Sequence, residues 1–181
     1  SIYIALIAVL ILFSALSPTF FTVSNVIIVL RQISSLGIMA LGMMYVMLLG
    51  NVDLSVGCEV SLLGIVMAYC MAELKLGIPV TILICVVLGL ILGAVNGFVV
   101  TYCKIPSIIA TLGTSWIFQG ISYTICQAQP IYGFPEGFST LGQGYIGPIP
   151  IPVVLFILCA LLTSFILNKT TYGRTLYAVG S

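Results

Sequence analysis

Side chains able to exchange hydrogen bonds with a solute recur at helical spacing along residues 107–126. The residues at i, i+4, i+8 and i+11, with one more on the flank, are Thr111, Ser115, Gln119, Ser122 and Thr114. Hydroxyls and an amide can replace the hydration hydrogen bonds of a neutral, hydroxyl-rich solute. This stripe is therefore predicted to line a solute path. The alternative is that the hydroxyls bond back to their own helix and that Gln119 pairs with a neighbouring helix.

A second polar feature is the glycine-bounded break Gly50–Gly57, which holds Asp53, the only aspartate of the chain. Long apolar runs lie on both sides of the break. An ionised carboxylate beside hydrocarbon is costly, so it is expected to face a bundle interior or a water-filled cavity. Asp53 either caps a helix that begins near Leu54 or Ser55, or contacts the solute. We expect a role in shaping the cavity mouth, with Asp53 and Ser55 both on the path.

Two further polar side chains belong to the predicted path. Asn96 lies on the glycine-containing side of its helix, and an interhelical hydrogen bond is its alternative role. Glu59 follows the break by one turn and can line the cavity, pair with Arg31 or stay protonated. The sequence leaves these alternatives open.

Catalytic chemistry has little material in this chain. There is no histidine, none of the six cysteines forms a CxxC pair, and no GxSxG, HExxH or GxxxxGK[ST] motif is present. We therefore expect no catalytic residue, no metal site, no cofactor and no ATP hydrolysis by the chain itself. The cysteines are interpreted as small apolar side chains.

Composition defines the broad class of protein. Of 181 residues, 61% are hydrophobic and 5% are charged. Soluble domains carry about a quarter charged residues, so this chain is predicted to be an integral membrane protein in contact with lipid. A formal net charge of +1 with no basic cluster argues against nucleic-acid binding.

The pattern of apolar segments predicts an all-α polytopic bundle of about six membrane helices. They are expected at Ile2–Leu16, Val26–Leu49, Ser55–Leu74, Ile78–Tyr102, Ser107–Cys126 and Ile151–Asn168, separated by Pro, Gly and Asn signals, with Ser24 and Asn25 as the cap of the second. Residues 127–150 form a loop, with room for a short surface-lying piece. Two four-residue repeats of small residues predict close packing of the third and fourth helices inside the bundle: Gly89, Gly93 and Gly97, and Gly57, Ser61, Gly64 and Ala68.

The basic residues predict the orientation. With the N-terminus in the cytoplasm, Lys104, Lys169 and Arg174 fall inside, and the loop 127–150, which has no Lys or Arg, falls outside. Lys75 is then external. Ile2–Leu16 is interpreted as a membrane helix whose beginning is missing, because a signal peptide would need a basic start and a small-residue cleavage site.

Several blocks, in order, resemble the ribose-type (carbohydrate-uptake) family of ABC importer permeases. They are Asp53–Gly57 (DLSVG), Asn96-Gly97, Ile105–Thr114 (IPSIIATLGT), Gln129–Ile131 (QPI) and Thr171–Gly180 (TYGRTLYAVG). Asn51 and Glu59 depart from the family pattern at the break. The resemblance covers about Asn25 to the end of the chain.

The resemblance implies a multi-pass subunit of the bacterial cytoplasmic membrane that imports a monosaccharide such as ribose or a related small polyol-like solute. It implies three partners: a second permease subunit in a homo- or heterodimer, a cytoplasmic ATP-binding subunit that hydrolyses ATP, and an extracytoplasmic solute-binding protein. Gly173, Arg174 and Tyr177 would couple to the ATPase. Residues 1–181 are then one incomplete permease domain, about the first two-thirds of a permease, with 168–181 as the start of a cytoplasmic coupling segment.

Other functions stay open at this point. An ABC permease for an autoinducer-type furanosyl signal is a close variant. An ion-coupled secondary transporter with discontinuous helices around Asp53 is an alternative of another class, although no inverted repeat is evident. A channel would lack a distinctive filter sequence, and a passive anchor leaves the stripe at Thr111 unexplained.

Overall fold

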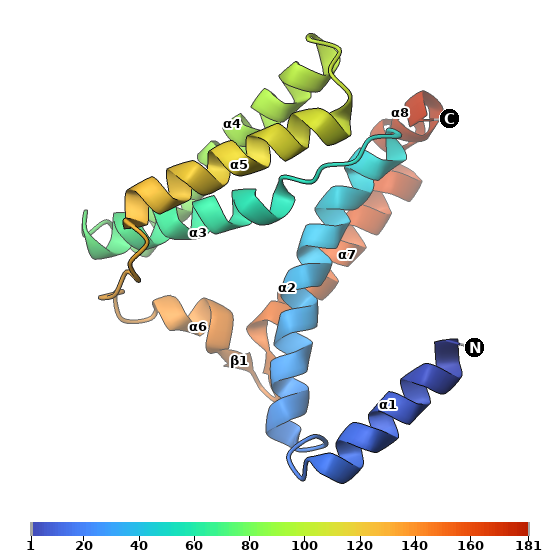
Figure 1. Cartoon of the computed structure of the whole chain (residues 1–181), viewed down its shortest axis with the longest axis vertical. Coiled ribbons are helices and arrows are strands. Elements are labelled where there is room, and N and C mark those ends of the chain that lie inside the picture. Colours follow the sequence, from blue (N-terminus) through green and yellow to red (C-terminus); the bar gives the residue numbers. More distant parts are fainter. Residues whose placement is uncertain (1, 181) are drawn as a thin grey trace.

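The computed structural model describes residues 2–180, so the two ends of the predicted domain, Ser1 and Ser181, lie outside the described residues. The chain is almost entirely helical (Figure 1). Its helices are α1 (Ile2–Leu16), α2 (Val23–Leu48), α3 (Val56–Ala72), α4 (Ile78–Thr101), α5 (Ser107–Cys126), α6 (Phe138–Gln143), α7 (Ile151–Lys169) and α8 (Thr171–Gly180). A small antiparallel hairpin, β1 (Tyr145–Ile146) and β2 (Ile149–Pro150), precedes α7.

A helical membrane bundle is confirmed, and the six expected segments correspond to α1–α5 and α7. By length and composition, three of these helices can cross a membrane, namely α2, α4 and α7. α1 and α3 are shorter apolar helices of 15 and 17 residues. The predicted cap of α2 at Ser24 and Asn25 is wrong, because the helix already begins at Val23. The N-cap is Thr22, whose hydroxyl accepts from the Asn25 N–H at 3.4 Å.

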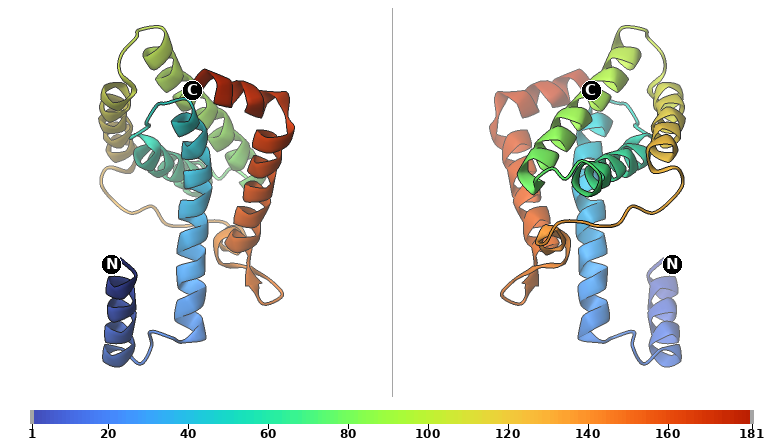
Figure 2. Two further views of the ribbon diagram at one scale, coloured as in Figure 1. Left: turned by 90° about the vertical axis from the view of Figure 1, so that its right-hand side faces the viewer. Right: turned by 90° about the vertical axis from the view of Figure 1, so that its left-hand side faces the viewer.

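The helices pack in two groups (Figure 1). α3 packs against α5 and α4, around a core of Leu62, Leu92 and Phe118, while α2 packs along α7. Figure 2 shows α1 standing apart from the other helices, and it contains no buried residue. The apolar outer faces of the helices suit a lipid environment, where no charged surface is needed.

Most of the small-residue repeats do not make the close contacts that the spacing predicts. Gly89 of α4 does approach α3, since a Cβ there would lie 3.4 Å from Leu63. Gly57, Gly64, Gly93 and Gly97 are exposed, and a Cβ at each would meet nothing within 4 Å. The predicted packing of α3 with α4 is present, but the role of the repeats in it is wrong for these four glycines, because large side chains such as Leu62 and Leu92 form that contact instead.

The long polar segment 127–150 is tied to α2 by Arg31. Its Nη2 donates to the Gln143 carbonyl at 2.6 Å, and its guanidinium carbon lies 4.8 Å from the centre of the Tyr145 ring. Arg31 is thus occupied by a backbone carbonyl and an aromatic face. The alternative in which Arg31 pairs with Glu59 is wrong, because the two side chains lie on different helix groups and no ion pair joins them within residues 2–180.

α8 folds back on the end of α7 through the face that contains Gly173 and Leu176, both buried. A Cβ added at Gly173 would overlap the backbone of Leu167, and one at Gly180 would overlap the carbonyl of Leu48 in α2. Arg174 and Tyr177 lie on the exposed side of α8. α8 and the α4–α5 turn lie toward one end of the molecule, and the α1–α2 turn and the hairpin lie toward the other (Figure 1).

Candidate functional site

The break between α2 and α3 begins with a regular helix stop. The Gly50 N–H donates to the Met47 carbonyl at 2.9 Å, and the Asn51 N–H donates to the Val46 carbonyl at 3.2 Å. This pair of bonds is a Schellman motif, which places its C′ residue in the left-handed region that favours glycine. Gly50 has φ +74, so its residue type follows from the turn.

The extended backbone after Gly50 is held by hydroxyls of α5. The Val52 N–H donates to Ser107 Oγ at 3.2 Å, and the Leu54 N–H donates to Thr111 Oγ1 at 3.0 Å. Thr111 in turn donates to the Ser107 carbonyl at 2.8 Å. Backbone groups away from water need such partners. Thr111, the first residue of the predicted stripe, thus holds the backbone of the break against α5.

Asp53 organises the start of α3 through Ser55. Its Oδ1 accepts from the Ser55 N–H at 2.8 Å and from the Ser55 hydroxyl at 2.6 Å. Ser55 is the N-cap residue of α3, is completely buried, and makes no side-chain bond to the first turn. Asp53 thus orders the cap residue, while direct capping of the exposed N–H groups of the first turn is not observed.

Asn96 of α4 continues this chain of hydrogen bonds and ends it with a free acceptor. Its Nδ2 donates to Ser55 Oγ at 2.8 Å, so one line of contacts joins α4 to the break and to Asp53. Asn96 is 5% exposed, and its Oδ1 has no hydrogen-bond partner within the described residues. A buried acceptor without a hydrogen bond lowers the stability of the fold by about 1–3 kcal/mol, so such a group is often retained for a function.

A cavity of about 250 Å³ lies against these groups, between the end of α2, the break, α4 and the start of α5. Its polar lining residues are Asn51, Asp53, Asn96, Thr101, Ser107 and Thr111, and its apolar walls include Val46, Leu49 and Val100. Apolar walls with a few convergent polar groups are typical of small-molecule sites. We call this the break cavity.

The structure brings together part of the predicted path. Asp53, Asn96 and Thr111 line the break cavity, and Ser55 adjoins it through its hydrogen bonds. Four predicted residues lie outside its lining: Glu59, Thr114, Ser115 and Gln119. Thr114 and Ser115 donate to carbonyls of their own helix at 3.2 and 2.6 Å. These two hydroxyls therefore bond back to their own helix, which is the alternative to lining a solute path.

The remaining two residues lie near other groups. Gln119 Nε2 contacts the Tyr123 hydroxyl at 3.5 Å on the same helix. Glu59 lies at the α3–α4 contact, where its Oε1 would be 4.0 Å from a Cβ at Gly89. The polar cavity residues outside the predicted path are Asn51, Thr101 and Ser107. Ser107 could have been found, because it precedes Thr111 by one helical turn and extends the same stripe.

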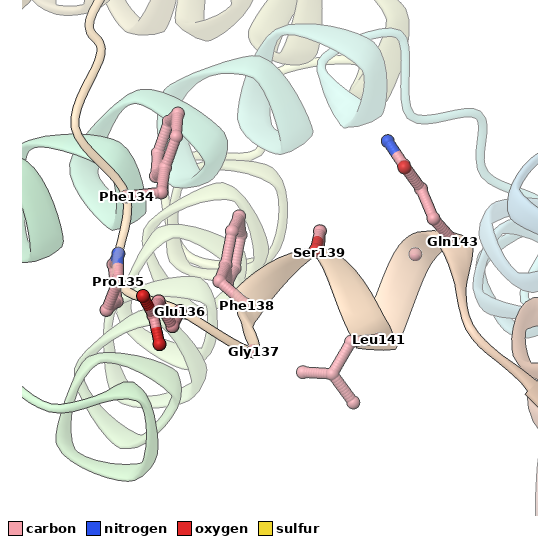
Figure 3. A pocket seen from close by; sticks show the side chains of 9 residues that line it. Phe134, Pro135, Glu136, Gly137, Phe138, Ser139, Leu141 and Gln143 are labelled. Atoms are coloured by element: carbon pink, nitrogen blue, oxygen red, sulfur yellow. The ribbon is translucent and has the colours of Figure 1, made fainter.

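Another hollow, next to α6, is less suited to a solute. The hollow formed by residues 134–143 is built from one continuous segment, with the rings of Phe134 and Phe138 stacked at 5.3 Å. Figure 3 shows these rings and Gln143 pointing to one side of α6, while Leu141 points to the other. The side chains diverge, so they do not enclose a ligand.

The support that Thr111 gives to the break can be tested by Thr111→Val, which preserves shape and removes the hydroxyl. The Leu54 N–H then lacks an acceptor, so we expect the free energy of unfolding to fall by about 1–3 kcal/mol. Thr124→Val on the same helix is the matched control, because its exposed hydroxyl donates only to the Gly120 carbonyl. Its expected change is within about 0.5 kcal/mol. Denaturant unfolding of the full-length protein in detergent measures both, and equal shifts would contradict this role.

The fold and the break cavity together define a polytopic helical membrane protein with a cavity of apolar walls and a few polar groups beside the break between α2 and α3. Residues 25–181 match the family described as branched-chain amino acid transport system / permease component, and the chain belongs to that family.

Similar proteins are named as sugar permeases. The ribose import permease protein of Haemophilus influenzae is 35% identical over 98% of this chain and 56% of its own length. The ribose import permease protein of Bacillus subtilis is 34% identical over 98% and 56%. The D-allose transport system permease protein of Escherichia coli is 33% identical over 93% and 52%. The chain thus spans about half the length of these curated relatives. No solved structure gives a significant match.

Proposed function

We propose that the chain belongs to the membrane-spanning permease subunit of an ATP-driven importer of a monosaccharide or related polyol-like solute. The observation that carries this proposal is the similarity over nearly the whole chain to permeases named for ribose and D-allose. The sugar-permease resemblance of the sequence blocks points the same way. The protein is then a multi-pass component of a bacterial cytoplasmic membrane.

The break cavity supplies the chemistry that this function needs. Asn96 Oδ1 is a buried acceptor without a protein donor, and Asp53 and Thr111 lie in the same lining. Less than 1 Å² of Asn96 Oδ1 is exposed, so a sugar hydroxyl in the cavity would donate to it after the side chain turns toward the solute. The predicted path residues outside the cavity lining are proposed to serve its continuation, which would run along α3 at Glu59 and along α5 at Thr114, Ser115 and Gln119.

The partners follow from the same proposal. A second permease subunit completes the path, a solute-binding protein delivers the sugar outside, and an ATP-binding subunit hydrolyses ATP in the cytoplasm. Arg174 and Tyr177 are the residues of α8 that face outward and can contact the ATPase. Gly173 contributes by holding α8 against α7. No catalytic step is assigned to the chain.

A furanosyl signal is a second candidate solute. The autoinducer 2 import system permease protein of Photorhabdus luminescens is 35% identical over 97% of this chain and 54% of its own length. Both solutes are small and rich in hydroxyls, so the same cavity chemistry serves either one.

Uptake into vesicles tests the proposal. We expect vesicles with the full-length subunit, its ATP-binding subunit and its binding protein to take up labelled D-ribose, D-allose or autoinducer 2 only with internal ATP. Uptake without ATP, or uptake that follows an ion gradient and stops on Asp53→Asn, would contradict it in favour of a secondary transporter.

A further inference from the structure

A second polar hollow lies at the opposite end of the α3–α5 pair from the break cavity. Its volume is about 540 Å³. It lies between the end of α3, the end of α5 and the segment that follows α5. Its lining residues are Tyr69, Glu73, Ile125, Cys126, Gln127, Gln129, Pro130, Ile131 and Tyr132. We call this the outer hollow.

The two cavities are separated by the length of α3. This helix begins directly after Ser55, beside the break cavity, and ends at Ala72, one residue before Glu73. Its 17 residues span about 25 Å at 1.5 Å per residue. The two cavities therefore lie at opposite ends of α3. In the orientation that the basic residues predict, the outer hollow faces the outside.

The polar side chains of the outer hollow have no partner within the protein. No hydrogen bond or ion pair within residues 2–180 uses the Glu73 carboxylate or the side-chain amides of Gln127 and Gln129. Amides offer donors and acceptors, and a carboxylate accepts only. These three exposed residues line one hollow and come from two helix ends and a loop, whereas the hollow at residues 134–143 is built from one continuous segment.

The backbone around the outer hollow is held in an uncommon conformation. Gln127 and Ala128 both have left-handed φ, +50 and +56, and the Gln129 N–H donates to the Cys126 carbonyl at 2.8 Å. Two successive residues other than glycine in this region cost free energy, and such positions cluster at functional sites. The turn carries Gln127 and Gln129 back over the ends of α3 and α5.

The charge of the lining selects the ligand class. The lining contains one carboxylate and no lysine or arginine, so an anion is disfavoured. The rings of Tyr69 and Tyr132 offer apolar faces with polar tips. A small ring that carries hydroxyl groups fits these features. Its hydroxyls would donate to Glu73 and to the glutamine amides, and its ring would pack against a tyrosine side chain.

We propose that the outer hollow is a binding site for a neutral, hydroxyl-rich ring such as a monosaccharide, occupied before the solute reaches the break cavity. This inference rests on the proposed function for the class of solute. Glu73 and Gln129 are its main hydrogen-bonding residues. The site lies on the side of the protein to which solute is delivered.

Cys126 is a native reporter, because it lines the outer hollow and is half-buried. The experiment uses the full-length subunit in vesicles, with its other cysteines replaced by alanine, and follows alkylation by a membrane-impermeant maleimide added outside. We expect D-ribose to slow the alkylation of Cys126 at least threefold, and cyclopentanol at the same concentration to leave it unchanged. A variant that retains only Cys103, exposed in the α4–α5 turn, should show no ribose effect when the vesicles are opened.

Glu73→Gln and Gln129→Ala then assign the protection to these side chains. Each should raise the half-protecting ribose concentration about tenfold. Glu136→Gln is the matched control, because Glu136 lines the hollow at residues 134–143 instead. This variant should leave the half-protecting ribose concentration unchanged. Absence of protection at 100 mM ribose, or equal protection in Glu73→Gln and Glu136→Gln, would overturn the site. ATP-driven uptake by the same vesicles without protection of Cys126 would overturn this site and leave the proposed function standing.

Discussion

Gly173→Ala is expected to displace α8 and to lower the stability of the full-length subunit by about 1–3 kcal/mol. A Cβ at this position would lie 2.6 Å from the Leu167 Cα and would overlap its carbonyl. These atoms are backbone of the neighbouring helix, so the strain cannot be relieved by a side-chain rotation. The buried Leu176 lies on the same face of α8 and would lose its packing against α7.

Gly64→Ala is the matched control for this change. Gly64 is also a helical glycine, but a Cβ there would meet nothing within 4 Å. Because alanine favours a helix over glycine by up to about 1 kcal/mol, this control is expected to be neutral or slightly stabilising. Thermal unfolding in detergent measures both variants. Loss of ATPase stimulation in Gly173→Ala alone would be the functional counterpart, and an equal response of the two variants would contradict the packing role of Gly173.

Asn96→Leu is expected to lower the rate of solute uptake about tenfold with little loss of stability. The change removes the free Oδ1 acceptor, whose bond to a solute hydroxyl would contribute about 1–1.5 kcal/mol, and 1.4 kcal/mol corresponds to a factor of ten. Ser55 keeps Asp53 as its acceptor, so the fold of the break is preserved. The variant also removes the unpartnered Oδ1 acceptor, which offsets the cost of leaving the Ser55 Oγ without the Asn96 donor.

Asn168→Leu is the matched control for Asn96. Asn168 is exposed near the end of α7, where its amide donates to the Ser164 carbonyl at 2.9 Å. Its replacement should leave uptake within about twofold of the wild type, since Asn168 does not line the break cavity. Uptake is measured at saturating loaded binding protein, and unfolding is measured on the same preparations. A parallel loss of uptake in both variants would contradict the role of Asn96.

The helices themselves could be predicted closely from the sequence. α1 and α5 have the bounds expected from composition, Ile2–Leu16 and Ser107–Cys126. The reason is that proline, glycine and polar caps punctuate apolar runs, and these signals act locally. The N-cap of α2 was misplaced because three neighbouring residues, Thr22, Ser24 and Asn25, can each serve as a cap.

The tertiary partners of the polar residues could not be predicted from spacing. Thr111 lies on the predicted stripe, yet its hydroxyl accepts from Leu54, which is 57 positions away in the chain. Periodicity gives the face of a helix, but it does not say whether a hydroxyl on that face meets a solute, its own helix or a broken backbone. For the same reason Arg31 could not be assigned to Gln143, at a separation of 112 positions.

The small-residue repeats show a further limit of the sequence. Gly57, Gly64, Gly93 and Gly97 have the spacing that permits close approach of helices, but none of them contacts another helix in this way among the described residues, and Gly93 and Gly97 line the break cavity. Spacing predicts that a helix can pack closely, and the bulk of Leu62, Leu92 and Phe118 determines which face does so here.

The most direct measurement is ATP-dependent uptake of labelled D-ribose, D-allose and autoinducer 2 by vesicles containing the complete transporter, with wild-type subunit and Asn96→Leu side by side. We predict uptake of at least one of these solutes by the wild type, only with ATP and the loaded binding protein, and a rate about tenfold lower for the variant. Wild-type uptake that needs no ATP would contradict the permease function. Equal rates for wild type and variant would contradict the placement of the break cavity on the solute path.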